Sequence, residues 1–293
     1  MKHLINQLLC PGVVVALILS MSCTRRDLEI PPTEGAVNIS FDWKNLYPDE
    51  DLPAGMSLYF YRNDGVTETR NCTSGGYTGT LPNGTYQVLA HNTDATGVAY
   101  RNMDTYTGAQ AYATSETKAT YLLQPLHAYG IGLQGTLTIT GESEASATIT
   151  PVSFVRKAVL KIILTGEQSA VASCVATLNG VVETVNISTG ELQEETGTIA
   201  FTPSSNANGF ESAVTFFGRV PGANNELTLI FNFTGGGSQT VTVDITAALE
   251  NVNTAVIPIE VNANIEISGS VAGEFQATLK DWSYTDKSVT VKQ

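Results

Sequence analysis

The sequence is poor in charged residues, and above all in basic ones. Of 293 residues, 15 are Lys or Arg and 28 are Asp or Glu, which gives a net charge of -13. Charged residues make up 15% of the chain, against roughly 25% in an average globular protein. Because a protein that grips a phosphate backbone needs cations opposite it, this composition argues against a nucleic-acid partner. The 42% hydrophobic content argues against a disordered chain.

Histidine is equally scarce, and the residues that carry common catalytic chemistry do not form patterns. There are three histidines, of which His91 and His127 are the two that follow the N-terminal leader. The sequence has no His pair at helical spacing, no Gly-x-Ser-x-Gly and no glycine-rich loop that opens a helix. We therefore predict no catalytic residues, no metal site and no cofactor, and we expect that the protein is not an enzyme.

Four cysteines are present, and two of them lie near the N-terminus, at Cys10 and Cys23. Cys72 and Cys174 lie far apart, so two independent thiols are expected, although the sequence leaves their pairing open. Two cysteines without paired histidines do not predict a zinc site.

Long hydrophobic runs are also missing, apart from a short one at residues 13–19. This run is too short for the roughly 20 residues that a bilayer requires, and Pro11 and Gly12 precede it. Lys2, the short apolar run and small residues before Cys23 are typical of a bacterial lipoprotein signal. We predict a signal peptide at 1–22, a lipid on Cys23, and a flexible tether over 23–35.

The remaining chain has the pattern of β-strands. Residues 37–43 alternate apolar and polar side chains, which predicts a half-buried strand. Residues 77–81 and 85–92 flank Pro82, Asn83 and Gly84, a strong signal for a hairpin. Similar short alternating segments, separated by Gly, Asn and Pro, continue to the end of the chain. This spacing predicts an all-β protein made of antiparallel β-sandwiches.

The mature length fits two domains of about 130 residues, each large enough for its own core. Glycine and proline cluster between Gln124 and Gly135. We therefore predict an N-terminal β-sandwich over 36–130 and a C-terminal β-sandwich over 131–293.

Two surface features have alternative interpretations. Tyr100, Tyr106 and Tyr112 recur every six residues, so an extended segment would place them on one face. They would then contact a partner or a glycan, although ordinary packing onto the first sandwich is the alternative. Residues 49–51, an Asp-Glu-Asp run, form either a solvated turn or part of a calcium loop, and the run lacks the alternating acidic pattern of calcium loops.

The string LPNGTYQVLAHN at residues 81–92 resembles a hairpin of Bacteroidetes fimbrillin-like lipoproteins. Segments at 119–130, 150–166 and 176–191 and a closing strand with Trp282 follow in the matching order. Together with the lipid signal, the chain resembles the FimB/Mfa-type family of fimbrial anchor or accessory subunits, which includes a related uncharacterised domain family. The resemblance implies two tandem transthyretin-like sandwiches and fimbriae built by strand exchange.

In that family, stalk subunits lose their first strand after an arginine. Here Arg25 and Arg26 precede the first strand, so cleavage after them would remove the lipid but leave the strand. The resemblance therefore favours an anchor or accessory subunit held in the outer membrane by the lipid on Cys23, with fimbrial subunits as partners. The alternative is a surface lipoprotein that binds a glycan or a host ligand. Alternating residues in the last segment, 288–291, indicate a closing strand and an end position in the fibre.

Overall fold

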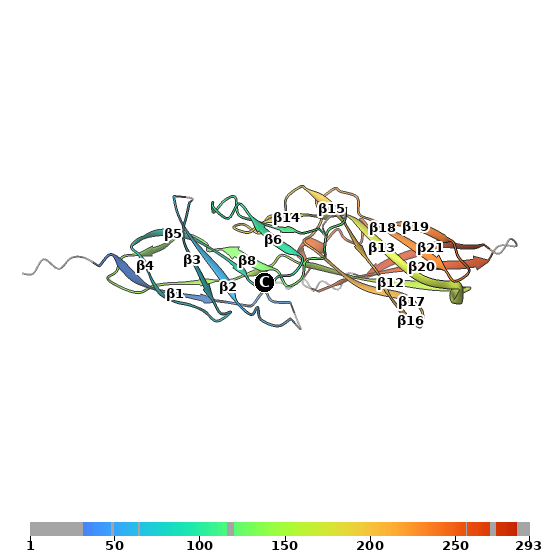
Figure 1. Cartoon of the computed structure of the whole chain (residues 1–293), viewed down its shortest axis with the longest axis horizontal. Coiled ribbons are helices and arrows are strands. Elements are labelled where there is room, and N and C mark those ends of the chain that lie inside the picture. The colour runs from blue at the N-terminus through green and yellow to red at the C-terminus, as the bar shows by residue number, and fades with distance from the viewer. Residues whose placement is uncertain are drawn as a thin grey trace, which may run out of the picture.

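The computed structural model describes residues 32–47, 50–63, 65–115, 120–255, 257–269 and 274–285. The predicted signal peptide, Cys23, most of the tether, Asp49 and the last segment at 288–291 lie outside these residues. The described chain forms strands connected by turns, with two short 3-10 helices, η1 (Gln168–Ala170) and η2 (Val252–Thr254). The predicted all-β fold is confirmed. The strands form an elongated molecule (Figure 1). Within the described residues, no helix has the length and apolar character needed to span a bilayer.

Two sheets enclose the first hydrophobic core. One has the order β10-β1-β4, and the other has the order β11-β8-β5-β2-β3, with β9 paired to β5. Alternation along β1 turns Val37 and Ile39 inward, where they pack with side chains such as Phe60 and Val88. The strand bounds are β1 Glu34–Phe41, β2 Met56–Arg62, β3 Gly65–Cys72, β4 Gly76–Pro82, β5 Gly84–Asn92, β8 Tyr129–Gly132, β9 Leu137–Ile139, β10 Ala145–Ile149 and β11 Val152–Ser153.

Two further sheets form a second sandwich, with the orders β16-β17-β12-β20-β21 and β15-β13-β18-β19. Leu160 and Ile162 from one sheet and Cys174 and Phe231 from the other belong to the same core. The bounds are β12 Arg156–Gly166, β13 Val171–Val182, β15 Thr196–Phe201, β16 Ser204–Asn206, β17 Gly209–Phe216, β18 Glu226–Phe233, β19 Ser238–Asp244, β20 Ile259–Gly269 and β21 Phe275–Thr285.

Pairing between the strands differs from the expectation in two respects. Strands β1 and β10 are parallel, as are β12 and β20, whereas the sequence predicts only antiparallel pairs. Strands β9, β10 and β11 all follow residue 130 but pair with strands of the first half. The expected boundary between residues 130 and 131 therefore falls within the first set of sheets, and the sheets themselves divide after Ser153.

A small sheet with the order β14-β7-β6 joins the two halves. Strands β6 (Val98–Arg101) and β7 (Gln110–Ala113) come from the first half of the chain, and β14 (Thr184–Asn186) comes from the second. Beneath it lies a third core that contains Tyr61, Leu89, Phe154, Val185 and Phe217. Because this core takes side chains from both halves, the two sandwiches are packed together at their junction.

Candidate functional site

The first strand is the candidate functional site, because it occupies the centre of its sheet. Val37 lies opposite Gly79 of β4 on one side and opposite Ala145 of β10 on the other. Its side chain is fully buried, as is that of Ile39. A strand paired on both edges and buried on one face is held by main-chain hydrogen bonds and by apolar contacts.

Glycines let the neighbouring segments approach β1 closely. A Cβ at Gly76, whose φ is +132°, would clash with the main-chain oxygen of Ile39. A Cβ at Gly35 would lie 2.7 Å from a methyl carbon of Ile139 and from the nitrogen of Gly141. A larger side chain at Gly35 or Gly76 would therefore collide with neighbouring atoms. Close packing around β1 thus requires glycine at both positions.

The sequence has no Lys or Arg within β1 or in the segments next to it, between Arg26 and Lys44. The strand begins at Glu34, after Arg25 and Arg26, and the next basic residue along the chain is Lys44. Cleavage after Arg25 or Arg26 would thus leave all of β1 in place. The start of β1 lies toward the end of the molecule that is remote from the second sandwich (Figure 1).

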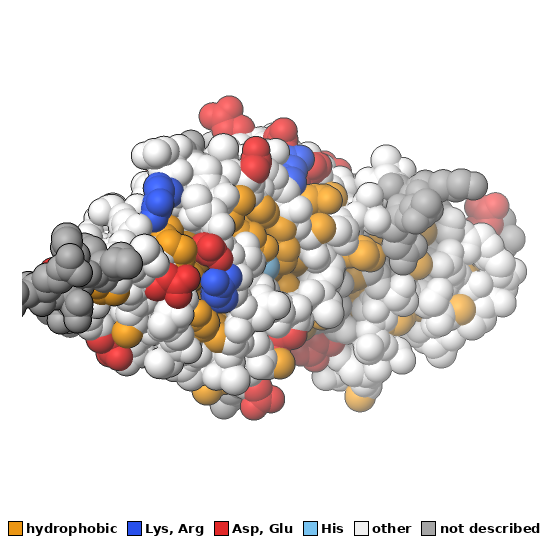
Figure 2. All heavy atoms as spheres, turned by 60° about the vertical axis from the view of Figure 1, so that its left-hand side comes forward, with side chains coloured by type: hydrophobic (Ala, Val, Ile, Leu, Met, Phe, Trp, Pro, Cys, Tyr) orange, Lys and Arg blue, Asp and Glu red, His pale blue; other side chains and the backbone are white. Residues whose placement is uncertain are grey.

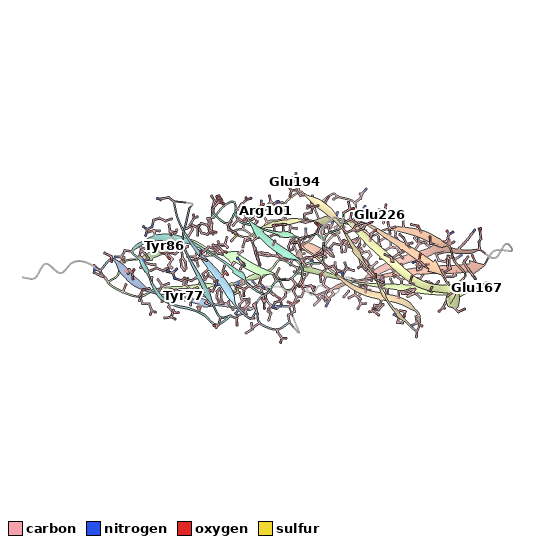
Figure 3. All side chains as sticks on the ribbon, in the orientation of Figure 1. Tyr77, Tyr86, Arg101, Glu167, Glu194 and Glu226 are labelled. Carbon is pink, nitrogen blue, oxygen red and sulfur yellow. The ribbon has the colours of Figure 1, made fainter. Side chains whose placement is uncertain are left out.

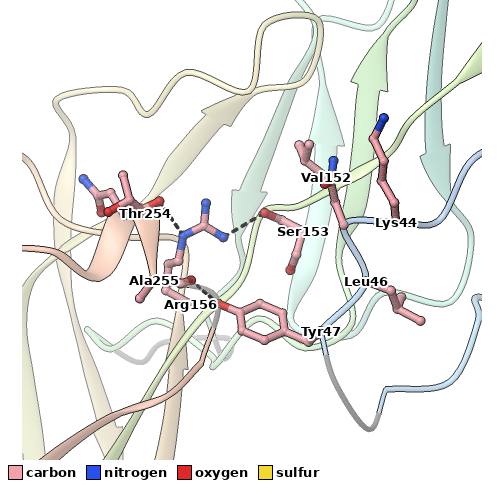
Figure 4. A pocket seen from close by; sticks show the side chains of 10 residues that line it. Lys44, Leu46, Tyr47, Val152, Ser153, Arg156, Thr254 and Ala255 are labelled. Atoms are coloured by element: carbon pink, nitrogen blue, oxygen red, sulfur yellow. Dashed lines mark hydrogen bonds between the residues drawn. The ribbon is translucent and has the colours of Figure 1, made fainter. Parts of the chain in front are cut away.

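The loop that follows β1 reaches the second sandwich. Tyr47 donates a hydrogen bond from its hydroxyl to the carbonyl of Ala255 at 3.0 Å. From β12, Arg156 donates through Nε to the carbonyl of Asn253 at 3.0 Å and through Nη1 to that of Ser153 at 2.9 Å (Figure 4). The pocket between these groups has a volume of about 320 Å3, and its lining also includes Lys44. The Tyr47 bond attaches the loop after β1 to the segment at Ala255, and the Arg156 bonds join Ser153 to Asn253 across the junction.

The three tyrosines singled out in the sequence do not share a face. In the β6-β7 pair, Tyr100 lies opposite Ala111 and Tyr112 lies opposite Ala99, so the two tyrosines point to opposite sides. Tyr106 lies in the connection between the strands. The expectation of one common face is wrong, because the segment folds back on itself between β6 and β7.

Each of these tyrosines has a partner within the protein. The ring of Tyr100 stacks on His91 at 3.8 Å between centroids, and that of Tyr106 packs edge-on against Tyr61 at 5.6 Å. Arg101 lies over the ring of Tyr112 at 5.3 Å. These contacts correspond to the packing alternative, and the predicted role of the tyrosines in ligand binding stays a prediction.

His91 is a buried strand residue with a local hydrogen bond. It is 5% exposed, its Nδ1 lies 2.8 Å from the carbonyl oxygen of Asn92, and its ring stacks with those of Tyr59 and Tyr100. Burial lowers the pKa of this histidine, because the charged form loses its hydration. The imidazole thus contributes to packing as a neutral ring.

The next residue, Asn92, organises the end of β5 through its fully buried amide. Its Nδ2 donates to the carbonyl of His127 and to Asp94 Oδ1, both at 2.6 Å. Its Oδ1 accepts the main-chain N–H of Tyr129 at 2.8 Å. Asn92 closes the string LPNGTYQVLAHN, and its side chain links that hairpin to the segment that begins β8.

Both described cysteines are free thiols. Cys174 is fully buried, and burial raises the pKa of its thiol to about 12. Cys72 is half-buried. Among the described residues, no group of three or more His, Cys, Asp or Glu side chains could hold a metal ion. Glu50, from the acidic run at 49–51, accepts a hydrogen bond from the hydroxyl of Tyr129.

Charged side chains are thinly spread over the surface. Figure 2 shows hydrophobic side chains gathered in the middle of one face of the molecule, with a histidine among them and a few charged groups around them. On the junction, Arg101 forms an ion pair with Glu195 at 3.2 Å, and Figure 3 shows Arg101 and Glu194 on the same side of the molecule. Such exposed pairs contribute little to stability.

Solved structures with similar folds come from Bacteroidetes. A "putative adhesin" from Bacteroides ovatus has a TM-score of 0.63 at 20% identity, over 88% of this chain and 98% of that one. The fimbrial anchor protein Mfa2 from Porphyromonas gingivalis has a TM-score of 0.58 at 8% identity, over 86% and 98%. The chain thus has the all-β fold of these Bacteroidetes proteins, and the resemblance noted from the sequence is confirmed for the fold.

Residues 22–202 match the family described as a domain of unknown function, DUF5119, and the chain belongs to this family. The matched region contains β1, the hairpin at Asn83 and the junction sheet. None of the curated proteins matches the chain in sequence.

Pairing of β1 with β10 is the feature of the site that the sequence did not reveal. Residues 145–149 alternate small or apolar side chains with polar ones, which is sufficient to indicate a strand. No local pattern identifies a parallel partner so far away along the chain.

Proposed function

We propose that this protein is a lipid-anchored outer-membrane subunit of a fimbria, in an anchor or accessory position, with a role in adhesion. The observation that carries the proposal is the first strand, which fills the centre of its own sheet. With no Lys or Arg between Arg26 and Lys44, cleavage at the two arginines leaves that strand intact. A subunit that keeps this strand offers no groove there for the strand of a neighbour.

The position of the start of β1 agrees with a lipid anchor on Cys23. Residues 24–33 separate Cys23 from β1, and an extended chain of that length spans roughly 35 Å. Because β1 starts toward one end of the long axis, a lipid on Cys23 would direct the second sandwich away from the membrane (Figure 1). Several acyl chains would be needed for firm retention, since one chain binds a membrane only marginally.

The fold of the fimbrial anchor protein Mfa2 supports the same role. We also propose that the chain has two sandwich domains, divided after Ser153 and linked by the junction sheet and its core. A connection through a shared sheet and a shared core suits a subunit that transmits mechanical load between a membrane and a fibre.

A deletion strain and a Cys23→Ala strain test the proposal together. In the deletion strain we expect fimbriae that are lost from the cells or released into the medium. In the Cys23→Ala strain we expect a folded protein that leaves the membrane fraction, because the cysteine precedes the folded region. Cys72→Ala is the matched control and should leave the protein in the membrane. Unchanged fimbriae in the deletion strain contradict the fimbrial role, and a Cys23→Ala protein that stays in the membrane at high salt contradicts the lipid anchor.

A further inference from the structure

The loop after β17 contains a buried arginine whose side chain bonds to the main chain of the same loop. Arg219 is 5% exposed, and its Nη2 donates a hydrogen bond to the carbonyl of Ala223 at 3.0 Å. Asn253 holds the main chain of the same residue, accepting from its N–H at 2.9 Å and donating to its carbonyl at 2.8 Å. The guanidinium is therefore fixed at the base of the loop.

This buried cation is incompletely satisfied. Its Nε is buried and has no hydrogen-bond partner within the part of the chain that the structure describes. No carboxylate in that part lies within ion-pair distance of the guanidinium. An unpaired buried charge is costly, so the position of this guanidinium calls for an explanation.

Arg219 lines a cavity of about 590 Å3, a size within the range of about 300–1,000 Å3 that is usual for small-molecule sites. Exposed Asp244 and Glu250 lie at its rim, so the cavity carries both positive and negative groups. Hydrogen bonds from the side chain and main chain of Thr246 hold the pKa of Asp244 below its usual value, which keeps this carboxylate ionised. Pro221 and Ala247 add apolar surface.

The charges restrict the chemistry of a ligand. A simple anion would meet two carboxylates at the rim, and a simple cation would meet the guanidinium. Arginine only donates hydrogen bonds and ionised carboxylates only accept them, whereas a hydroxyl group does both. A neutral molecule with several hydroxyl groups therefore satisfies the arginine and the carboxylates at the same time.

We propose that the cavity of Arg219, Asp244 and Glu250 binds a neutral oligosaccharide. Ring hydroxyls accept from Nη1 of the guanidinium, because Nη2 donates to Ala223 and Nε is buried. They donate to the carboxylates, and the sugar ring lies against Pro221 and Ala247. The site is distant in sequence from Tyr100, Tyr106 and Tyr112, and it does not depend on the fimbrial role.

Binding is tested with the purified full chain and four neutral hexasaccharides, made of glucose in α or β linkage, mannose or N-acetylglucosamine. We expect at least one of them to shift the amide NMR signals of Thr246 and Ala247. Glu250→Ala should weaken that binding about tenfold or more, because a hydrogen bond to a charged group is lost. Asp244→Asn should weaken it in the same direction. Both residues are exposed, so both variants should fold.

Glu167→Gln is the matched control, because Glu167 is exposed at the remote end of the second sandwich (Figure 3). This variant should bind as the unaltered protein does. The proposal is overturned if none of the four sugars binds, or if binding is unaffected by Glu250→Ala and Asp244→Asn. Free glycine that shifts the same amides in place of the sugars would also overturn it, since the cavity would then be a site for zwitterions.

Discussion

Gly76 lies against the main-chain oxygen of Ile39, so the turn that begins β4 is in direct contact with the first strand. The φ of Gly76 is +132°, a backbone conformation that residues with a Cβ rarely adopt. The contact and the conformation together require glycine at this position. The packing of β1 therefore depends on the conformation of this turn.

Gly76→Ala should destabilise the protein by about 2 kcal/mol or more, because the added Cβ meets main-chain atoms and the backbone is strained. Urea denaturation of the purified protein measures the change in the free energy of unfolding. Gly235→Ala is the control, since a Cβ there meets open space and should change stability by less than about 0.5 kcal/mol. Equal effects of the two substitutions would show that β1 does not require a close approach at Gly76.

Asn92→Ala should lower the free energy of unfolding by about 2–4 kcal/mol. The substitution removes three hydrogen bonds and leaves the N–H of Tyr129 and the carbonyl of His127 without their partner. Differential scanning calorimetry measures the effect as a lower melting temperature. Asn38→Ala is the comparison, because Asn38 is exposed and forms one long hydrogen bond to Glu144. Comparable losses at the two positions would refute the role of Asn92 in linking β5 to β8.

Arg156→Ala should loosen the junction between the sandwiches. The guanidinium donates hydrogen bonds to the carbonyl oxygens of Ser153, Val155 and Asn253. Its loss removes these donors from carbonyl oxygens on both sides of the junction. We expect a loss of roughly 2 kcal/mol or more in the free energy of unfolding. Lys157→Ala, at the exposed neighbouring position, should change stability by less than about 0.5 kcal/mol. Unfolding curves that coincide for the two variants would contradict the assignment.

Stability should fall as the pH drops below about 6.5, in part because of His91. Burial lowers its pKa in the folded state, so below the ordinary pKa the unfolded chain binds a proton that the folded chain does not. Above that pH both states are neutral and His91 has no effect. We expect His91→Gln to flatten the pH dependence of the free energy of unfolding below about 6.5. Identical pH profiles for His91→Gln and the unaltered protein would exclude this contribution.

Local features of the fold could be predicted from the sequence, because they depend on neighbouring residues. Alternation over 37–43 predicts a strand that the structure has as Glu34–Phe41, and Asn83 with Gly84 marks the turn between β4 and β5. Turn conformation and side-chain alternation are both properties of a few consecutive residues.

Distant relationships could not be predicted in this way. The return of β10 to β1 is a parallel pairing of remote segments, and glycines and prolines near residue 130 gave no indication that later strands belong to the first sheets. The common face predicted for Tyr100 and Tyr112 required an extended segment. Instead the chain turns between them, where Asn102 has a φ of 54°. The Arg219 cavity likewise depends on loops that only the fold brings together.

The central claim is that this protein lies at an end of a fimbria, because it keeps the strand that would otherwise be replaced by a neighbour. A short epitope inserted at Gly236, in a turn with open space around it, allows gold labelling on isolated fimbriae under the electron microscope. The account predicts gold at one end of each fibre and none along the shaft. Gold at regular intervals along the shaft would contradict it.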